Sequence, residues 1–124
     1  MAYVGIQTML LAYKMRKSDK EFELMQITQD KLSATKQSTE LGKQFADAKH
    51  ALDKGSDDYS ELYEGLNAQY NNDLADIAAW ENELEQKEQN AQSEISYLNG
   101  YINSWQSALS EGIKKAHNYG ATSS

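Results

Sequence analysis

The residues with the most chemical potential in this chain are two histidines and nineteen carboxylates. One spacing is that of a possible metal-ligand set: Asp47-x-x-His50-x-x-Asp53 would put three polar groups on one face of a helix. Polar groups on a helix face are more often solvated than metal-bound, and no cysteine is present to extend the set. We therefore interpret these three residues as a solvated face.

A run of carboxylates is formed by Glu81, Glu83, Glu85 and Glu88. At 3.6 residues per turn its members spread around a helix rather than converging on one point, which again indicates solvation. No Glu-x-x-His, Gly-rich phosphate loop or Gly-x-Ser-x-Gly motif occurs, and the eight tyrosines are of a type that packs more often than it reacts. The sequence predicts no catalytic residue, no cofactor and no metal site, so we expect a protein that is not an enzyme.

Length and composition favour one helical domain. The chain has 124 residues, no proline and seven glycines, so little interrupts long helices.

The net charge of −7, with Arg16 as the single arginine, argues against nucleic acid as a partner. The charge is uneven: residues 1–54 carry nine Lys and Arg against seven acids, whereas residues 55–124 carry three against twelve. The two halves can therefore attract each other.

The first half has a heptad pattern that predicts one helix over residues 5–53. Apolar and small residues recur in alternating steps of three and four, as in a helix with one packing face. The positions on this face are Tyr3, Ile6, Leu10, Tyr13, Lys17, Lys20, Leu24, Ile27, Lys31, Ala34, Ser38, Leu41, Phe45, Ala48 and Leu52.

A turn is predicted at residues 54–58. Gly55 is expected to adopt the left-handed conformation of a helix C-cap residue. Asp58 and Glu61 have the spacing of a capping box, so a second helix should cover residues 59–117. We expect the polar tail, residues 118–124, to be frayed.

The second helix has a clearer heptad pattern than the first. Its packing positions are Leu74, Ile77, Glu81, Leu84, Glu88, Ala91, Ile95, Leu98, Ile102, Trp105, Leu109, Gly112 and Ala116. The predicted fold is all-α: a long antiparallel two-helix coiled-coil hairpin formed by a single domain, residues 1–124. Gly65 and Gly100 are the points at which the second helix would break.

The expected position of the turn also predicts which residues face each other. A hairpin centred near residue 56 puts Lys31 opposite Glu81, a polar pair within two otherwise apolar faces. Such a pair at packing positions can fix register. The alternative is that both side chains extend along the helices to water.

The first helix has a second apolar face, opposite the first. It contains Leu11, Met15, Phe22, Met25 and Leu32, with polar Ser18 and Gln29 completing steps of three and four. One partner helix cannot cover two opposed faces, so either another chain covers this face or the second helix folds back to form a three-helix bundle. The predicted oligomer interface consists of Tyr3, Ile6, Leu10, Leu11, Met15, Phe22, Met25, Leu32, Ile102, Trp105 and Leu109.

The apolar stretch at residues 3–13 is too short to span a membrane and is interrupted by Gly5, Gln7 and Thr8. It has no basic start and no cleavage site of a Sec-type signal peptide. We expect no transmembrane segment, and secretion without a cleavable signal is favoured over a cytoplasmic location.

The layout resembles that of small helical-hairpin proteins of bacterial secretion systems: needle, rod or filament subunits of type III systems, and WXG100 proteins of type VII systems. Tyr63-Glu64-Gly65 is a counterpart of the Trp-x-Gly turn of WXG100 proteins, although no Tyr-x-x-x-Asp/Glu follows near the C-terminus. Needle subunits share a C-terminal helix rich in Ile, Leu and Tyr but usually have proline in the turn, which is absent from residues 54–58. The resemblance implies export without cleavage, followed by helical polymerisation or pairing.

Two functions follow as hypotheses. The first is an exported structural subunit that assembles with itself into a helical filament or similar assembly, with a secretion apparatus or chaperone as a further partner. The second is a helical adaptor or secretion chaperone, which would bind a partner's helix and remain a small defined oligomer.

Overall fold

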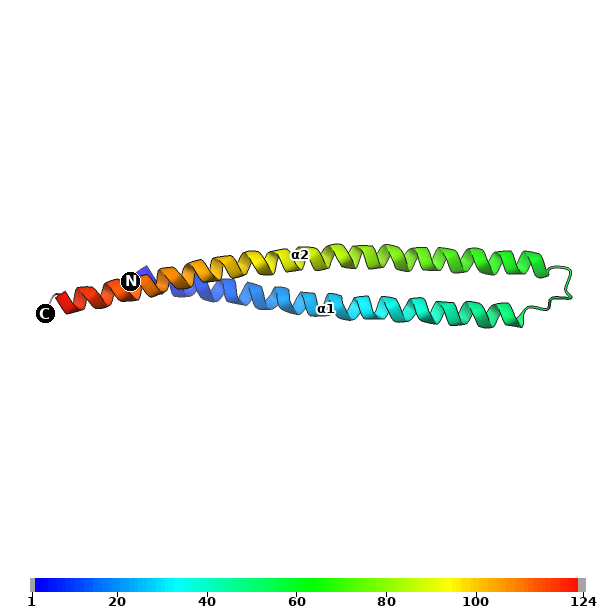
Figure 1. Ribbon diagram of the computed structural model, residues 1–124, viewed down its shortest axis with the longest axis horizontal. Helices are drawn as coiled ribbons and strands as arrows, with labels where there is room; N and C mark the ends of the chain where they lie inside the picture. Colours follow the sequence, from blue (N-terminus) through cyan, green and yellow to red (C-terminus); the bar gives the residue numbers. More distant parts are fainter. Residues whose placement is uncertain (1, 123–124) are drawn as a thin grey trace. The chain divides into compact units, whose positions relative to one another are not determined.

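The computed structural model describes the backbone of residues 2–122 and the side chains of residues 4–117. Helix α1 is Ala2–Ala51 and helix α2 is Tyr59–Thr122, and residues 52–58 connect them (Figure 1). The two helices pack against each other, which confirms the predicted all-α helical hairpin. No helix among the described residues is long and apolar enough to cross a membrane.

The chain forms two compact units, each containing part of both helices. Unit 1 combines Met1–Met25 with Gln89–Ser124, and unit 2 is Gln26–Glu88. In unit 1 the rings of Tyr13 and Tyr101 stack with centroids 5.1 Å apart, and Lys20 Nζ lies 3.1 Å from Glu94 Oε2. Residue numbers rise along α2 as they fall along α1, so the helices of unit 1 are antiparallel.

Unit 2 shows the same antiparallel pairing. The rings of Phe45 and Tyr70 stack with centroids 4.5 Å apart, and Lys31 Nζ lies 3.1 Å from Glu88 Oε2. Among the described side chains, the buried residues of this unit are Ile27, Ala34, Ile77 and Leu84, and those of unit 1 are Leu10, Ala91, Leu98 and Ile102. In both units the core is thus a single line of side chains between two helices.

The packing face of α1 follows the predicted heptad. From Ile6 to Leu52 every predicted position is buried or half-buried, while the side chain of Tyr3 lies outside the described residues. Ala34 is fully buried, because a small side chain lets α2 approach closely at that point. We call this face the seam of α1.

The seam of α2 differs from its heptad prediction at two positions. Trp80 is half-buried and Glu81 is exposed, so the seam runs Ile77, Trp80, Leu84, Glu88 in steps of three, four and four. A step of three from Ile77 to Trp80 replaces the predicted step of four to Glu81, so the large Trp80 side chain packs and the Glu81 carboxylate stays in water. Ala116, predicted in the seam, is also exposed.

The connection between the helices corrects the expected C-cap. α1 ends at Ala51, and no described glycine has a positive φ, so Gly55 is not a left-handed cap residue. The Gly55 N–H instead donates to Asp53 Oδ1 at 3.0 Å, which forms the turn from an aspartate side chain. The carbonyl of Asp58 accepts the first bond of α2, from Leu62 N–H at 2.9 Å, as expected of an N-cap residue.

The glycines of α2 do not interrupt it. Gly65 and Gly100 both lie within the continuous helix Tyr59–Thr122, so the alternative in which the second helix folds back is wrong. The backbone is helical to Thr122, five residues beyond the predicted end at residue 117; the tail residues 123–124 and the side chains of residues 118–124 lie outside the described residues.

Leu84 tests whether the seam holds unit 2 together. Its side chain is buried, so Leu84→Ala should lower the free energy of unfolding by about 2–5 kcal/mol, through lost transfer energy and a residual cavity. The control is Leu62→Ala, which truncates an exposed leucine of the same helix and unit and should change stability by less than about 0.5 kcal/mol. Urea denaturation followed by circular dichroism measures both, and equal losses would contradict a single-seam core.

Candidate interaction surface

The outward face of α1 in unit 1 is an uncovered apolar surface. Leu11, Met15, Phe22 and Met25 are 53–61% exposed, and their spacing puts them on the side of the helix opposite the seam. Ser18 completes their spacing and is also exposed. We call these five residues the outer stripe. Leu32, the remaining residue of the predicted second face, is exposed too but belongs to unit 2.

The outer stripe is exposed because α1 has two apolar faces and α2 contacts only one of them. Leu11 and Met25 lie about 100° around the helix from the seam residues Leu10 and Leu24, and Met15, five residues after Leu10, lies about 140° from it. The stripe as a whole therefore points away from α2. Scattered exposed apolar residues are normal on a protein surface. Four on one face of one helix form a contiguous patch of the kind found at interaction sites.

Two lysines of the α1 seam form ion pairs with exposed glutamates of the same helix. Lys17 Nζ lies 3.6 Å from Glu21 Oε1, one turn along α1. Lys20 donates to Glu23 Oε2 at 3.0 Å and also pairs with Glu94 of α2. These hydrogen bonds to Glu23 and Glu94 raise the pKa of Lys20, so its ammonium is held in the charged form that ties α1 to α2 in unit 1.

A tyrosine cluster in unit 1, which the sequence did not predict, includes the seam residue Tyr13. Tyr101 stacks on Tyr13 across the helices, and its hydroxyl is 2.6 Å from that of Tyr97. This hydrogen bond raises the pKa of Tyr101, so its phenol gives up the proton less readily than a free tyrosine does. Arg16 lies over the Tyr13 ring at 5.8 Å, and the cluster borders a shallow groove of about 510 Å³. The i, i+4 spacing of Tyr97 and Tyr101 was the available signal.

The structure places several predicted interface residues elsewhere. Leu10 and Ile102 are each only 7% exposed, buried between α1 and α2, so they are not available to another chain and the prediction is corrected for these two. Ile6, Trp105 and Leu109 are half-buried within unit 1. They help to pack the hairpin, which leaves the outward residues as the candidate interface.

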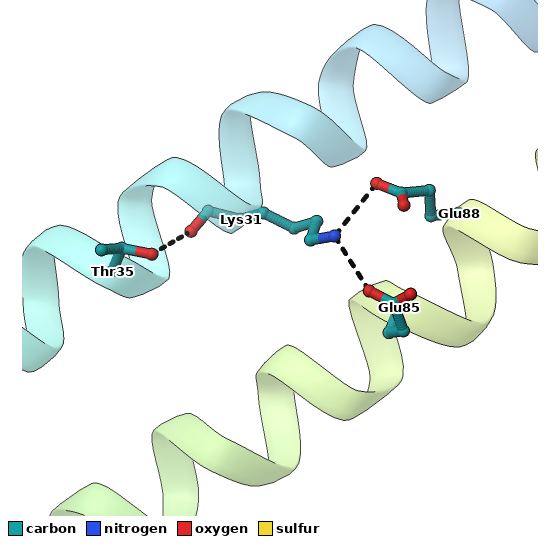
Figure 2. Close-up of polar contacts among 4 residues, drawn as sticks. All are labelled: Lys31, Thr35, Glu85 and Glu88. Carbon is teal, nitrogen blue, oxygen red and sulfur yellow. Dashed lines mark hydrogen bonds and ion pairs between the residues drawn. The ribbon is translucent and has the colours of Figure 1, made fainter.

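Lys31 in unit 2 is a polar residue within the seam of α1, as predicted. It does not pair with Glu81, the partner predicted for it. Its ammonium donates to Glu85 Oε2 at 2.9 Å and to Glu88 Oε2 at 3.1 Å, as Figure 2 shows, while Glu81 is exposed. The contacts are four and seven residues further along α2 than predicted. Heptad positions specify only which face packs; the offset along the helix depends on the connection, which is longer than the predicted turn.

The Lys31 ammonium lies between two carboxylates and forms an ion pair with each of them. The Lys31 side chain is 36% exposed and that of Glu88 is 20% exposed, so the pair is partly shielded from water. Hydrogen bonds to Glu85 and Glu88 raise the pKa of Lys31. The hydroxyl of Thr35 donates to the Lys31 carbonyl at 3.1 Å and so remains within its own helix (Figure 2).

The chemistry considered from sequence finds no assembled site. Among the described residues, no group of three or more histidines, aspartates and glutamates is arranged to hold a metal ion, and this includes Asp47, His50 and Asp53. The Glu85 and Glu88 carboxylates converge on an ammonium rather than on an open position.

Comparison with known proteins adds no family. The sequence matches no protein-family model, and neither a curated protein nor a solved structure is significantly similar to it. The function must be argued from the surface itself.

The Lys31 cluster predicts a defect on substitution. Lys31→Met should lower the free energy of unfolding at pH 7, because Glu85 and Glu88 would then repel each other with no cation between them. The control, Lys36→Met, removes an exposed lysine of the same helix and should be nearly neutral. Urea denaturation measures both variants, and equal effects would show that the cluster adds nothing to stability.

The same cluster has a predicted pH dependence. The folded chain holds the Lys31 proton more tightly than the unfolded chain, whose lysine has a pKa near 10.5. The stabilisation is complete below pH 10.5 and is lost as pH rises through the raised pKa. The stability difference between the chain and Lys31→Met should therefore shrink above pH 10.5, whereas Lys31→Arg, with a permanently charged side chain, should keep its advantage over Lys31→Met.

Proposed function

We propose that this chain is a non-enzymatic structural subunit that assembles with copies of itself through the outer stripe, as an exported component of a helical filament or similar assembly. The observation that carries the proposal is the exposure of Leu11, Met15, Phe22 and Met25 on a helix whose other face is already packed. Fully burying a side chain of this kind is worth about 1.5–3 kcal/mol, so four per copy provide a substantial drive for association.

A second copy of the chain fits this surface better than nucleic acid or an anionic membrane. The net charge of −7 opposes binding to either polyanion. The outer stripe is an apolar helix face bordered by both Lys14 and Glu21, and such a face is complementary to another of the same kind. Support for export and for a filament comes from the resemblance in layout to secretion-system hairpin proteins.

The competing function uses the same surface. An adaptor or secretion chaperone would receive a helix of a different protein on the outer stripe by helix-on-helix docking. Alone it would remain a small defined oligomer at every concentration. A structural subunit would form assemblies whose mass increases as the protein concentration rises.

Phe22→Asp tests self-assembly through the outer stripe. The substitution puts a carboxylate in the middle of the stripe, where burial between chains would cost several kcal/mol. In analytical ultracentrifugation the mass of the parent should exceed the 14.0 kDa of the monomer and should rise with protein concentration. The mass of the variant should remain near 14.0 kDa, and its helix content should be unchanged. Electron microscopy of the parent over the same concentration series shows whether the assembly is a filament or a discrete particle.

The matched control is Leu62→Asp, which puts the same charge on an exposed leucine outside the stripe and should leave assembly unchanged. A parent chain that stays monomeric at every concentration, or a Phe22→Asp variant that assembles like the parent, would overturn the proposal. A parent that stays a small oligomer of fixed size would favour the adaptor.

A further inference from the structure

We infer that two copies of this chain pair antiparallel through unit 1, with a two-fold axis passing close to Ser18 of each α1. The inference rests on the proposed self-assembly and specifies the orientation, the centre and the extent of the outer-stripe contact. Because a two-fold contact closes on itself, the pair is the repeating unit of the assembly, and growth beyond the pair requires a second contact. It follows from the spacing of the outer stripe, the charges beside it and the distribution of net charge between the two units.

The spacing of the outer stripe reads almost the same in both directions. Met15 and Phe22 lie three and four residues from Ser18, and Leu11 and Met25 each lie seven residues from it. A two-fold interface uses the same patch on both copies, so it requires a surface of this symmetry. Antiparallel pairing brings Leu11 of one copy near Met25 of the other and Met15 near Phe22. The small Ser18 at the centre lets the two helices approach closely.

The charges beside the outer stripe favour antiparallel over parallel pairing. Lys14 and Glu21 are exposed, seven residues apart, and lie along the same edge of the stripe. In the antiparallel pair Lys14 of each copy lies beside Glu21 of the other, which gives two opposite-charge contacts. In a parallel pair the two copies of this edge lie on opposite sides of the contact, so neither of these Lys14–Glu21 contacts forms.

Net charge limits the contact to unit 1. Residues 26–88, which form unit 2, carry six lysines against fourteen Asp and Glu, a net charge of −8. The remaining residues carry six Lys and Arg against five acids, a net charge of +1. Two copies of unit 1 therefore associate without net repulsion, whereas two copies of unit 2 repel each other. Leu32, on unit 2, is for this reason outside the contact.

Engineered cysteines test the geometry directly, because the chain has none of its own. Ser18→Cys in the full chain should form a disulfide-linked dimer on mild oxidation, since the two copies of residue 18 lie close to the axis. Leu11→Cys and Met25→Cys should each fail to link to themselves: with a rise of 1.5 Å per residue, the two copies of either position lie about 20 Å apart. A mixture of Leu11→Cys and Met25→Cys chains should again form linked dimers. Leu32→Cys gives the background from random collision.

The outcomes separate this inference from the proposed function. If Phe22→Asp dissociates the assembly but Leu11→Cys, Ser18→Cys and Met25→Cys all link equally well, the function stands and the pairing is parallel, so the inference is overturned. The inference also fails if the parent assembles and Ser18→Cys links no better than Leu32→Cys. If the parent is monomeric at every concentration, the proposed function and the inference fail together.

A charge exchange gives a second measurement that leaves the apolar residues intact. Lys14→Glu should weaken dimerisation several-fold by placing two carboxylates together twice in the interface, and adding Glu21→Lys should restore most of the affinity. Sedimentation equilibrium measures the dissociation constants. Lys36→Glu, on unit 2, is the control for the change in net charge. A double variant no tighter than Lys14→Glu alone would contradict the antiparallel arrangement.

Discussion

A helix gains free energy from packing only when its apolar side chains recur on one face, and this constraint organises the hairpin. The seam of α1 keeps alternating steps of three and four from Ile6 to Leu52, so both units are built on the same face of the same helix. Because the core is one line of side chains between two helices, each helix keeps most of its surface in water. A second apolar face on α1 therefore finds no partner within the hairpin.

The seam of α1 could be predicted because its period is a local property of the sequence. The seam of α2 was predicted apart from Glu81 and Ala116, and the departure at Glu81 has a clear cause. A strict heptad assigns the position to Glu81, but the neighbouring Trp80 offers far more apolar area, and a change to steps of three, four and four buries it instead. Periodicity alone does not compare the apolar area of neighbouring side chains, whereas the packing of the two helices depends on that area.

The register and the tyrosine cluster were less accessible to sequence reasoning. Facing residues depend on the connection, where an aspartate-based turn replaced the expected glycine cap and changed its length. Lys31 still forms ion pairs at the observed register, because its long side chain lets the ammonium reach Glu85 and Glu88 on the next turns of α2. The stack of Tyr13 on Tyr101 likewise depends on the offset between the helices, so it had no signal in either helix alone beyond tyrosine spacing.

The position of the outer stripe along α1 is itself informative. Beyond Leu32 the same face continues as Lys36, Thr39 and Lys43, so the apolar character stops within the part of the helix that belongs to the acidic unit 2. If solubility alone had shaped this surface, the net charge would be largest around the exposed apolar residues, where repulsion between copies best opposes association. The reverse is found: uncovered apolar side chains gather in the unit with a net charge of +1, and repulsive charge gathers in the other. The exposed apolar side chains and the net negative charge are thus concentrated in different units, and this distribution supports the proposed association at one defined place.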